Sequence, residues 1–176
     1  MLVLVVGPSG AGKDALLNAA RVAFRDDPRV HFARRVITRP PDPDGENHEA
    51  VTEAEFDARR FALSWSAHGL RYGIPLDAVE KAPVVVANVS RGVIAGAARR
   101  MEVRVIEVTA PPHILAARLS ARGREGAADI AARLARAAAI PDGVARETVR
   151  NDGTLAAGEE RFIAALRRVV RQASQS

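Results

Sequence analysis

The segment from Gly7 to Asp14, with the sequence GPSGAGKD, has the residue types and spacing of a loop that binds phosphate groups. It matches G-x-x-x-x-G-K, follows an apolar run over 2–6 and precedes helical spacing over 13–24. Glycines let successive backbone N–H groups converge on an anion, and Lys13 adds a positive charge that can follow the β- and γ-phosphates. We therefore predict that the loop binds ATP. The residues concerned are Gly7, Pro8, Ser9, Gly10, Ala11, Gly12, Lys13 and Asp14.

Asp14 stands where loops of this kind end in serine or threonine, whose hydroxyl holds Mg²⁺. A carboxylate oxygen is also a hard ligand, and water can fill the other positions around the ion. We expect Asp14 to hold Mg²⁺ directly or through water. The alternative is that its charge only stabilises the N-terminus of the following helix.

Two further groups of polar residues have informative spacing. Arg118 and Arg122 are four residues apart, which places them on one face of a helix, and Arg133 follows eleven residues later. Asn88 and Ser90 lie two apart at the end of an apolar run, so their side chains are expected to point the same way. That position is the carboxyl end of a predicted strand, where open α/β sheets bind ligands.

Mainly apolar runs over 2–6, 82–90 and 103–110 alternate with helical segments, the pattern of an α/β domain with a parallel sheet. A shorter run over 30–38 is read as another strand. Thr52 followed by Glu55 predicts a helix start, and the glycine-punctuated segment 61–75 predicts small strands in a hairpin. The C-terminal segment 156–172 is predicted as an amphipathic helix. We expect one domain over 1–176.

Composition limits the class of protein and of partner. The chain of 176 residues has a formal charge of +5, no cysteine and only two lysines, Lys13 and Lys81. The many arginines reflect either coding bias or an anionic partner. With 4% aromatic residues and no basic cluster among them, we expect a small polyphosphate and no nucleic acid. The sequence has no run of 18 apolar residues that could form a transmembrane helix, and no basic segment of the kind that begins a secretion signal. We therefore expect a cytoplasmic protein. We also expect a monomer or homodimer.

The order GPSGAGK, TRPPDPDGE, WSAHGLRYG, RLSARG and ARLARA resembles the guanylate kinase superfamily across essentially the whole chain. The resemblance implies a P-loop core, an acceptor-binding excursion over about 34–80 and a helical lid over about 118–138. It implies that Arg118, Arg122 and Arg133 are lid arginines that act in catalysis with Lys13. Exposed helix arginines without a catalytic role are the alternative.

The acceptor region departs from guanylate kinases. Arg39 and Tyr72 match two phosphate-binding positions of that family, but Asp42 replaces its second acceptor arginine. Ser64 stands where the family has a glutamate that binds guanine, and Ile74 replaces a small hydroxyl residue that also contacts the base. A site without these hydrogen bonds loses discrimination for the base.

The motifs GKD, VITRP, GENHEA, W-x-AHGL-x-YGIP and N-x-SRG resemble the ribose 1,5-bisphosphate phosphokinases of phosphonate utilisation. This resemblance implies ATP-dependent formation of 5-phosphoribosyl 1-diphosphate, with Mg²⁺ as cofactor. The acceptor candidates are Arg39, His48, His68, Tyr72, Asn88, Ser90 and Arg91. A phosphate nucleophile needs no general base, and none is evident. A nucleoside monophosphate kinase and a non-catalytic binding module remain as alternatives.

Overall fold

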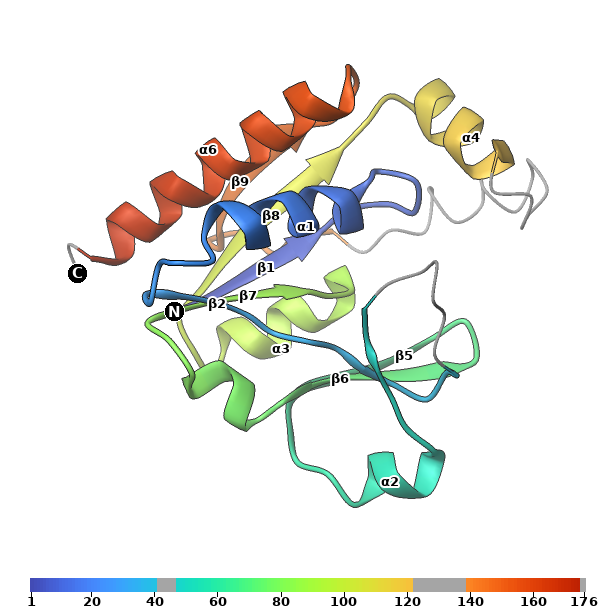
Figure 1. The fold of residues 1–176 in the computed structure, drawn as a ribbon. Coiled ribbons are helices and arrows are strands. Elements are labelled where there is room, and N and C mark those ends of the chain that lie inside the picture. The colour runs from blue at the N-terminus through green and yellow to red at the C-terminus, as the bar shows by residue number, and fades with distance from the viewer. Residues whose placement is uncertain (41–46, 122–138, 175–176) are drawn as a thin grey trace.

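A computed structural model describes residues 1–40, 47–121 and 139–174. Its main sheet has five parallel strands in the order β2-β7-β1-β8-β9 (Figure 1). These strands are β1 (Leu2–Val6), β2 (Val30–Phe32), β7 (Val84–Asn88), β8 (Val103–Thr109) and β9 (Ala145–Arg150). The predicted α/β domain with a parallel sheet is therefore confirmed.

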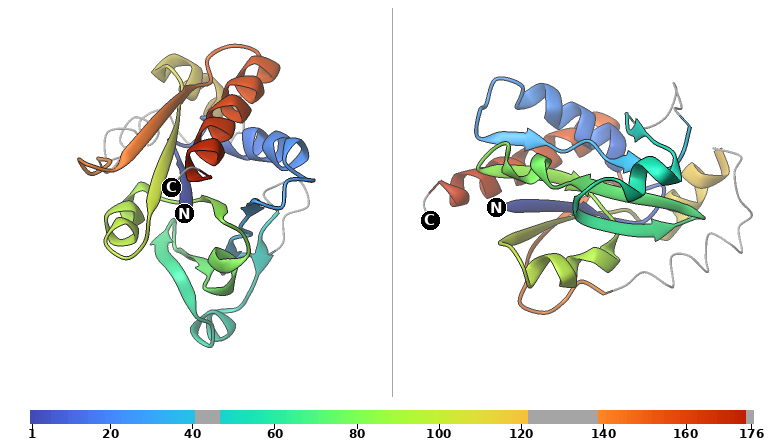
Figure 2. Two further views of the ribbon diagram at one scale, coloured as in Figure 1. Left: turned by 90° about the vertical axis from the view of Figure 1, so that its left-hand side faces the viewer. Right: turned by 90° about the horizontal axis from the view of Figure 1, so that it is seen from below.

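Both faces of this sheet are covered. Val3 and Val5 of β1 contribute to a core formed with α1 (Lys13–Ala23) and α6 (Leu155–Ala173). Leu2, Leu4 and Val6 contribute to a second core that includes residues of α3 (Ile94–Ala98) and of the smaller sheet. Figures 1 and 2 show α1 and α6 on one side of the sheet and α3 on the other. Burial on both faces explains why β1 is an unbroken apolar run.

A second, four-stranded sheet has the order β4-β3-β6-β5 and lies within the predicted acceptor excursion. Its strands are β3 (Val36–Ile37), β4 (Glu49–Ala50), β5 (Phe61–Ala67) and β6 (Leu70–Pro75). The predicted hairpin is β5 and β6, joined through His68 and Gly69, which have φ of 53° and 71°. Two positive φ values are typical of the tight turns that join antiparallel strands.

The predicted helix start at Thr52 is confirmed, because α2 (Glu53–Asp57) begins there with a capping box formed by Thr52 and Glu55. The prediction of one strand over 30–38 was wrong. β2 pairs with β7 of the main sheet, whereas β3 pairs with β4 and β6. The chain passes from one sheet to the other between them, a long-range choice that an apolar run does not reveal.

The strand β9 was not predicted. Only Val149 is buried among its six residues, and its sequence ARETVR is mostly charged or polar. It lies at the edge of the main sheet, where it pairs with β8 and packs against α6 through Val149. Edge strands of this composition lack the apolar signal of central ones.

The proposed division into core, acceptor excursion and lid stays a prediction. Of the predicted lid over about 118–138, the structure describes 118–121, the last residues of α4 (Pro112–Ala121), and these include Arg118. Arg122, Arg133 and Asp42 lie outside the described residues.

Among the helices that the structure describes, none combines the length and apolar character needed to cross a bilayer.

Candidate active site

The phosphate loop connects β1 to α1, as predicted. Gly12 is the N-cap of α1 with φ 86°, a left-handed conformation that favours glycine. Gly7 lies against the carbonyl of Val108 so closely that an added Cβ would overlap it. Lys13 Nζ donates hydrogen bonds to the carbonyls of Gly7 and Pro8, at 2.8 and 3.0 Å. The lysine thus lies over the loop whose anion it is predicted to contact.

Asn151 holds this loop from the opposite end of the sequence. Its side chain is 3% exposed, and its Nδ2 donates to the carbonyl of Ala11 at 2.8 Å. Its own backbone N–H donates to the carbonyl of Thr109 at 2.7 Å, which fixes the residue at the end of β9. The amide is enclosed by two glycines: an added Cβ at Gly12 would lie 2.6 Å from Nδ2, and one at Gly158 would overlap Oδ1.

Asn151 was not predicted as a site residue, because β9, the strand that positions it, has no apolar signal in the sequence. The only local signal is an asparagine followed by Asp152 and Gly153 before a helix. Asn151, which directly follows β9, nevertheless donates a side-chain hydrogen bond to the phosphate loop.

Arg118 is the described member of the three predicted lid arginines. It lies on α4, and its Nη1 donates to the carbonyl of Gly10 at 3.3 Å. An added Cβ at Gly10 would lie 3.1 Å from Leu119 Cγ, so α4 packs directly on the phosphate loop. Its catalytic role remains a prediction, supported by this position.

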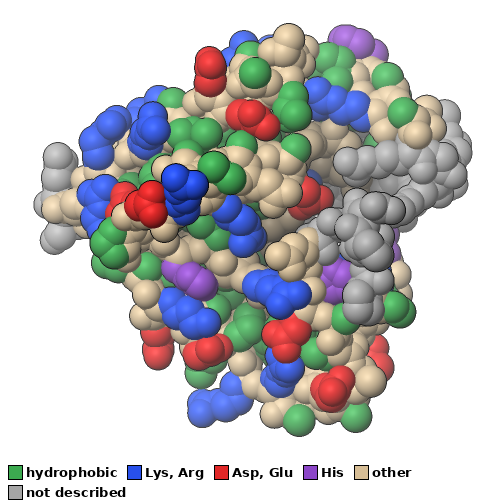
Figure 3. All heavy atoms as spheres, viewed as in Figure 1, with side chains coloured by type: hydrophobic (Ala, Val, Ile, Leu, Met, Phe, Trp, Pro, Cys, Tyr) green, Lys and Arg blue, Asp and Glu red, His purple; other side chains and the backbone are tan. Residues whose placement is uncertain are grey.

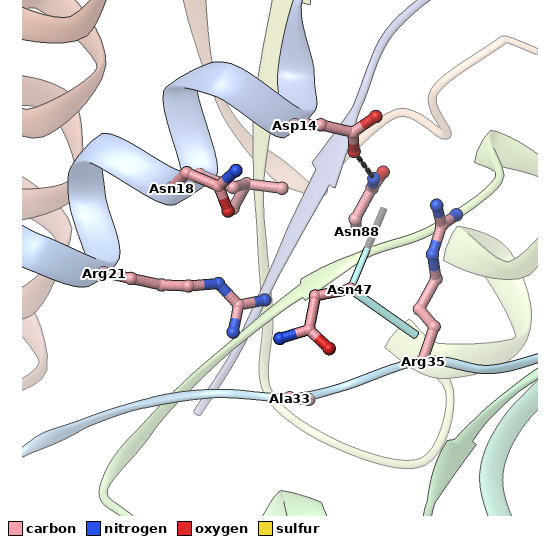
Figure 4. Close-up of a pocket in the computed structure, with 8 residues that line it drawn as sticks. Asp14, Asn18, Arg21, Ala33, Arg35, Asn47 and Asn88 are labelled. Carbon is pink, nitrogen blue, oxygen red and sulfur yellow. Dashed lines mark hydrogen bonds between the residues drawn. The ribbon is translucent and has the colours of Figure 1, made fainter. Parts of the chain in front are cut away.

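Asp14 and Asn88 come together at the carboxyl edge of the main sheet. Asn88 ends β7 and pairs in register with Val5 of β1, the strand that leads into the phosphate loop. Its Nδ2 donates to Asp14 Oδ1 at 3.1 Å (Figure 4). The two residues are 74 positions apart in the sequence. This contact orients the carboxylate next to the loop.

The residues at this edge fit a magnesium ion. Asp14 is exposed and supplies a carboxylate, and Asn88 supplies an amide beside it. Mg²⁺ in kinases takes one or two carboxylates together with substrate phosphates and water, so a single acidic side chain is sufficient. No group of three or more acidic, histidine or cysteine side chains that could hold a metal occurs within the described ranges.

Ser90 and Arg91 have structural partners. Ser90 is exposed, and its Oγ accepts from the N–H of Gly92 at 3.4 Å, where it caps the 3-10 helix η2 (Arg91–Val93). Arg91 Nη2 donates to Glu107 Oε1 at 2.7 Å in a largely buried ion pair. Their spacing predicted side chains that point the same way, but Asn88 is buried whereas Ser90 is exposed. Their roles in acceptor binding remain predictions.

Arg39 and His48 form a connected pair. Arg39 Nη2 lies 3.3 Å from His48 Nδ1, and His48 Nε2 lies 3.2 Å from the carbonyl of Arg39. A guanidinium can only donate, so Nδ1 is the acceptor and the imidazole proton belongs on Nε2. His48 is 5% exposed. This geometry makes His48 a support for the predicted phosphate-binding Arg39.

Tyr72 is buried in β6 and stacks on Trp65 of β5, with ring centroids 5.4 Å apart and planes 7° from parallel. Ile74, two residues further, is fully buried in the core. It therefore presents nothing to a nucleobase, which supports the predicted loss of guanine contacts. His68 is exposed at the hairpin turn, and no hydrogen bond or ion pair joins it to the other acceptor candidates in the described part of the chain.

A pocket opens between α1 and the segments that precede β3 and β4 (Figure 4). The space in and around it, open solvent included, is about 360 Å³. Its lining consists of Asp14, Leu17, Asn18, Arg21, Ala33, Arg35, Asn47 and Asn88. Four of these polar residues were not predicted: Asn18, Arg21, Arg35 and Asn47. The available signal was the spacing of 14, 18 and 21, which places three polar residues on one helix face.

No protein-family model matches the chain. A ribose 1,5-bisphosphate phosphokinase PhnN from Acidiphilium cryptum is 55% identical over 170 residues, which cover 95% of this chain and 92% of that protein. The protein of the same name from Methylobacterium radiotolerans is 51% identical over 174 residues, with 94% and 97% covered. The crystal structure of guanylate kinase from Anaplasma phagocytophilum is similar over 96% of this chain and 85% of that one, with a TM-score of 0.61 at 18% identity.

Proposed function

We propose that this protein transfers the γ-phosphoryl group of ATP to the 1-phosphate of ribose 1,5-bisphosphate. The reason is that the chain belongs to the ribose 1,5-bisphosphate phosphokinase family. The products are ADP and 5-phosphoribosyl 1-diphosphate. The observation that carries this proposal is a glycine-rich phosphate loop whose far edge, at Asp14 and Asn88, opens directly into a polar pocket. Donor and acceptor phosphates can therefore meet at one end of α1.

The nucleophile needs no general base. The second pKa of a phosphate monoester is about 6, so the attacking oxygen is already ionised near neutral pH. The protein has to hold two highly charged groups in line and to stabilise the charge of the transferring group. Lys13 and Arg118, which both contact the phosphate loop, are placed to supply positive charge on the donor side.

Asp14 would hold Mg²⁺ in this reaction, with Asn88 orienting its carboxylate. The ion would supply positive charge that offsets the negative charge of the phosphates. The exposed side chain of Asp14 and its place on the first turn of α1 support this assignment.

A nucleoside monophosphate kinase is the second candidate, because the fold is that of guanylate kinases. Ser64 and the buried Ile74 weigh against it, since Ser64 lacks the carboxylate that binds guanine in that family and Ile74 has no polar side-chain group. On the face shown in Figure 3, Lys and Arg side chains are interspersed with Asp and Glu, which fits a small-molecule substrate better than nucleic acid.

We further propose a cytoplasmic enzyme that acts as a monomer or homodimer.

The test is ADP release with Mg·ATP, measured in parallel on ribose 1,5-bisphosphate and on GMP, with the mass of the product determined. We expect turnover on the sugar bisphosphate alone, and its loss in Lys13→Ala. Turnover on GMP alone would replace the proposal with the nucleotide kinase. Inactivity of the folded protein on both would favour the non-catalytic module.

A further inference from the structure

We infer that Tyr72 acts through its aromatic ring, which positions Arg35 at the reacting end of the pocket, and not through its hydroxyl. The inference rests on the proposed function, because it takes a phosphate group of the acceptor to react beside Asp14. It departs from the family resemblance, which assigns Tyr72 to phosphate binding.

The register of the smaller sheet brings Trp65, Tyr72 and Arg35 to one face. Trp65 pairs directly with Tyr72 in the hairpin of β5 and β6, and Tyr72 pairs with Ile37 of β3. Side chains alternate between the two faces of a strand, so Arg35, two residues before Ile37, lies on the same face as Tyr72. Arg35 is therefore a diagonal neighbour of Tyr72, at a separation that an aromatic and a long side chain can bridge.

The ring of Tyr72 contacts both of these neighbours. It stacks on Trp65 with centroids 5.4 Å apart and planes 7° from parallel, and Arg35 Cζ lies over it, 5.6 Å from its centroid. The second distance is within the range of a cation–π contact. Tyr72 is 8% exposed, and Trp65 packs against the core that contains Leu63 and Ile74. The ring is thus a fixed support for the guanidinium that lies over it.

Arg35 brings positive charge to the end of the pocket where we propose that phosphate groups react. Figure 4 shows its guanidinium beside Asn88 and Asp14, and all three residues line the same pocket. In the proposed reaction two highly charged phosphate groups meet beside a carboxylate, so a cation at this position offsets the repulsion between them. Because an arginine side chain has many rotamers, the contact with the ring keeps its charge at that position.

The test is a double-mutant cycle of Tyr72→Leu and Arg35→Gln, measured as kcat/KM for ribose 1,5-bisphosphate. We expect Tyr72→Leu to lower this value about 5- to 30-fold, the size of a partly desolvated cation–π contact. Tyr72→Phe, which keeps the ring, should recover most of the loss. Arg35→Gln should lower the value at least as far, and Tyr72→Leu should add no further loss in that background. The KM for ATP should stay the same throughout the cycle.

The matched control is Phe56→Leu. Phe56 is 3% exposed, stacks on Phe61 and has Arg71 Cζ 4.3 Å from its centroid, so it repeats the arrangement of two rings and an arginine. Arg71 directly precedes Tyr72 and therefore lies on the opposite face of β6. Phe56→Leu should leave kcat/KM unchanged, and urea unfolding midpoints show how much stability each loss of a ring costs.

Equal losses in Tyr72→Phe and Tyr72→Leu would assign the effect to the hydroxyl and overturn the inference. Losses that multiply in the double variant, or an equal loss in Phe56→Leu, would also overturn it. Failure of the proposed function looks different: the wild type would use GMP and not ribose 1,5-bisphosphate, and the same cycle run with GMP would still show the dependence of Tyr72 on Arg35. A folded wild type that uses neither acceptor would overturn both.

Discussion

Replacing Gly158 by alanine tests whether Asn151 positions the phosphate loop. In an unconstrained helix interior, alanine is more favourable than glycine by about 1 kcal/mol. Here an added Cβ would overlap Asn151 Oδ1 and lie 3.1 Å from its Cγ. The amide would have to turn away from Ala11, and Asn151 is 3% exposed, so its Nδ2 would be left buried without a partner, as its Oδ1 already is.

Such an unsatisfied group costs about 1–3 kcal/mol. We therefore expect Gly158→Ala to lower the free energy of unfolding by up to about 2 kcal/mol after the helix propensity gain is subtracted. We also expect the KM for ATP to rise, because the carbonyl of Ala11 loses its support. Urea unfolding midpoints and steady-state kinetics measure the two effects.

The decisive comparison is made in the Asn151→Ala background. Without the amide, the added methyl has room, so the same substitution should stabilise the protein by about 1 kcal/mol. Gly96→Ala in α3 is the matched control, since an added Cβ there meets its nearest atom at 4.0 Å. It should stabilise both backgrounds equally. If Gly158→Ala stabilises the protein even with Asn151 present, the proposed contact does not constrain the loop.

Three further predictions concern metal binding, catalysis and pH. Asp14→Asn should raise the Mg²⁺ concentration for half-maximal activity by about tenfold or more, and an unchanged Mg²⁺ titration would leave only a helix-terminal role. Arg118→Ala should lower kcat by about 10³-fold, with partial recovery in Arg118→Lys; a change in the KM for ATP alone would limit Arg118 to supporting the loop. Burial, with the positive charges of Lys81 and Arg21, lowers the pKa of His31 from 6.5. Because the unfolded chain then binds the proton more readily, stability should fall as the pH decreases through about 6.5, and urea midpoints of His31→Gln should show a smaller decrease.

The contiguous features of this protein were predictable. The phosphate loop is specified by glycine positions and by the strand and helix on either side of it, all within residues 2–23. The capping box at Thr52 is equally local. In contrast, β9 is stabilised by its pairing with β8 and its packing against α6, and its charged sequence carries no independent strand signal.

The sequence by itself determined the chemistry of the protein: a loop that binds phosphate, a carboxylate at its end, and buried strands alternating with helices. The tertiary structure decided which distant residues complete that chemistry. Asn151 reaches Ala11 across 140 positions, and Asn88 reaches Asp14 across 74. Arg35 lies at the same pocket as Asp14 only because the chain leaves one sheet for the other after β2. Each contact depends on strand order and register, which arise from the burial of many apolar residues together and are not encoded in any short segment.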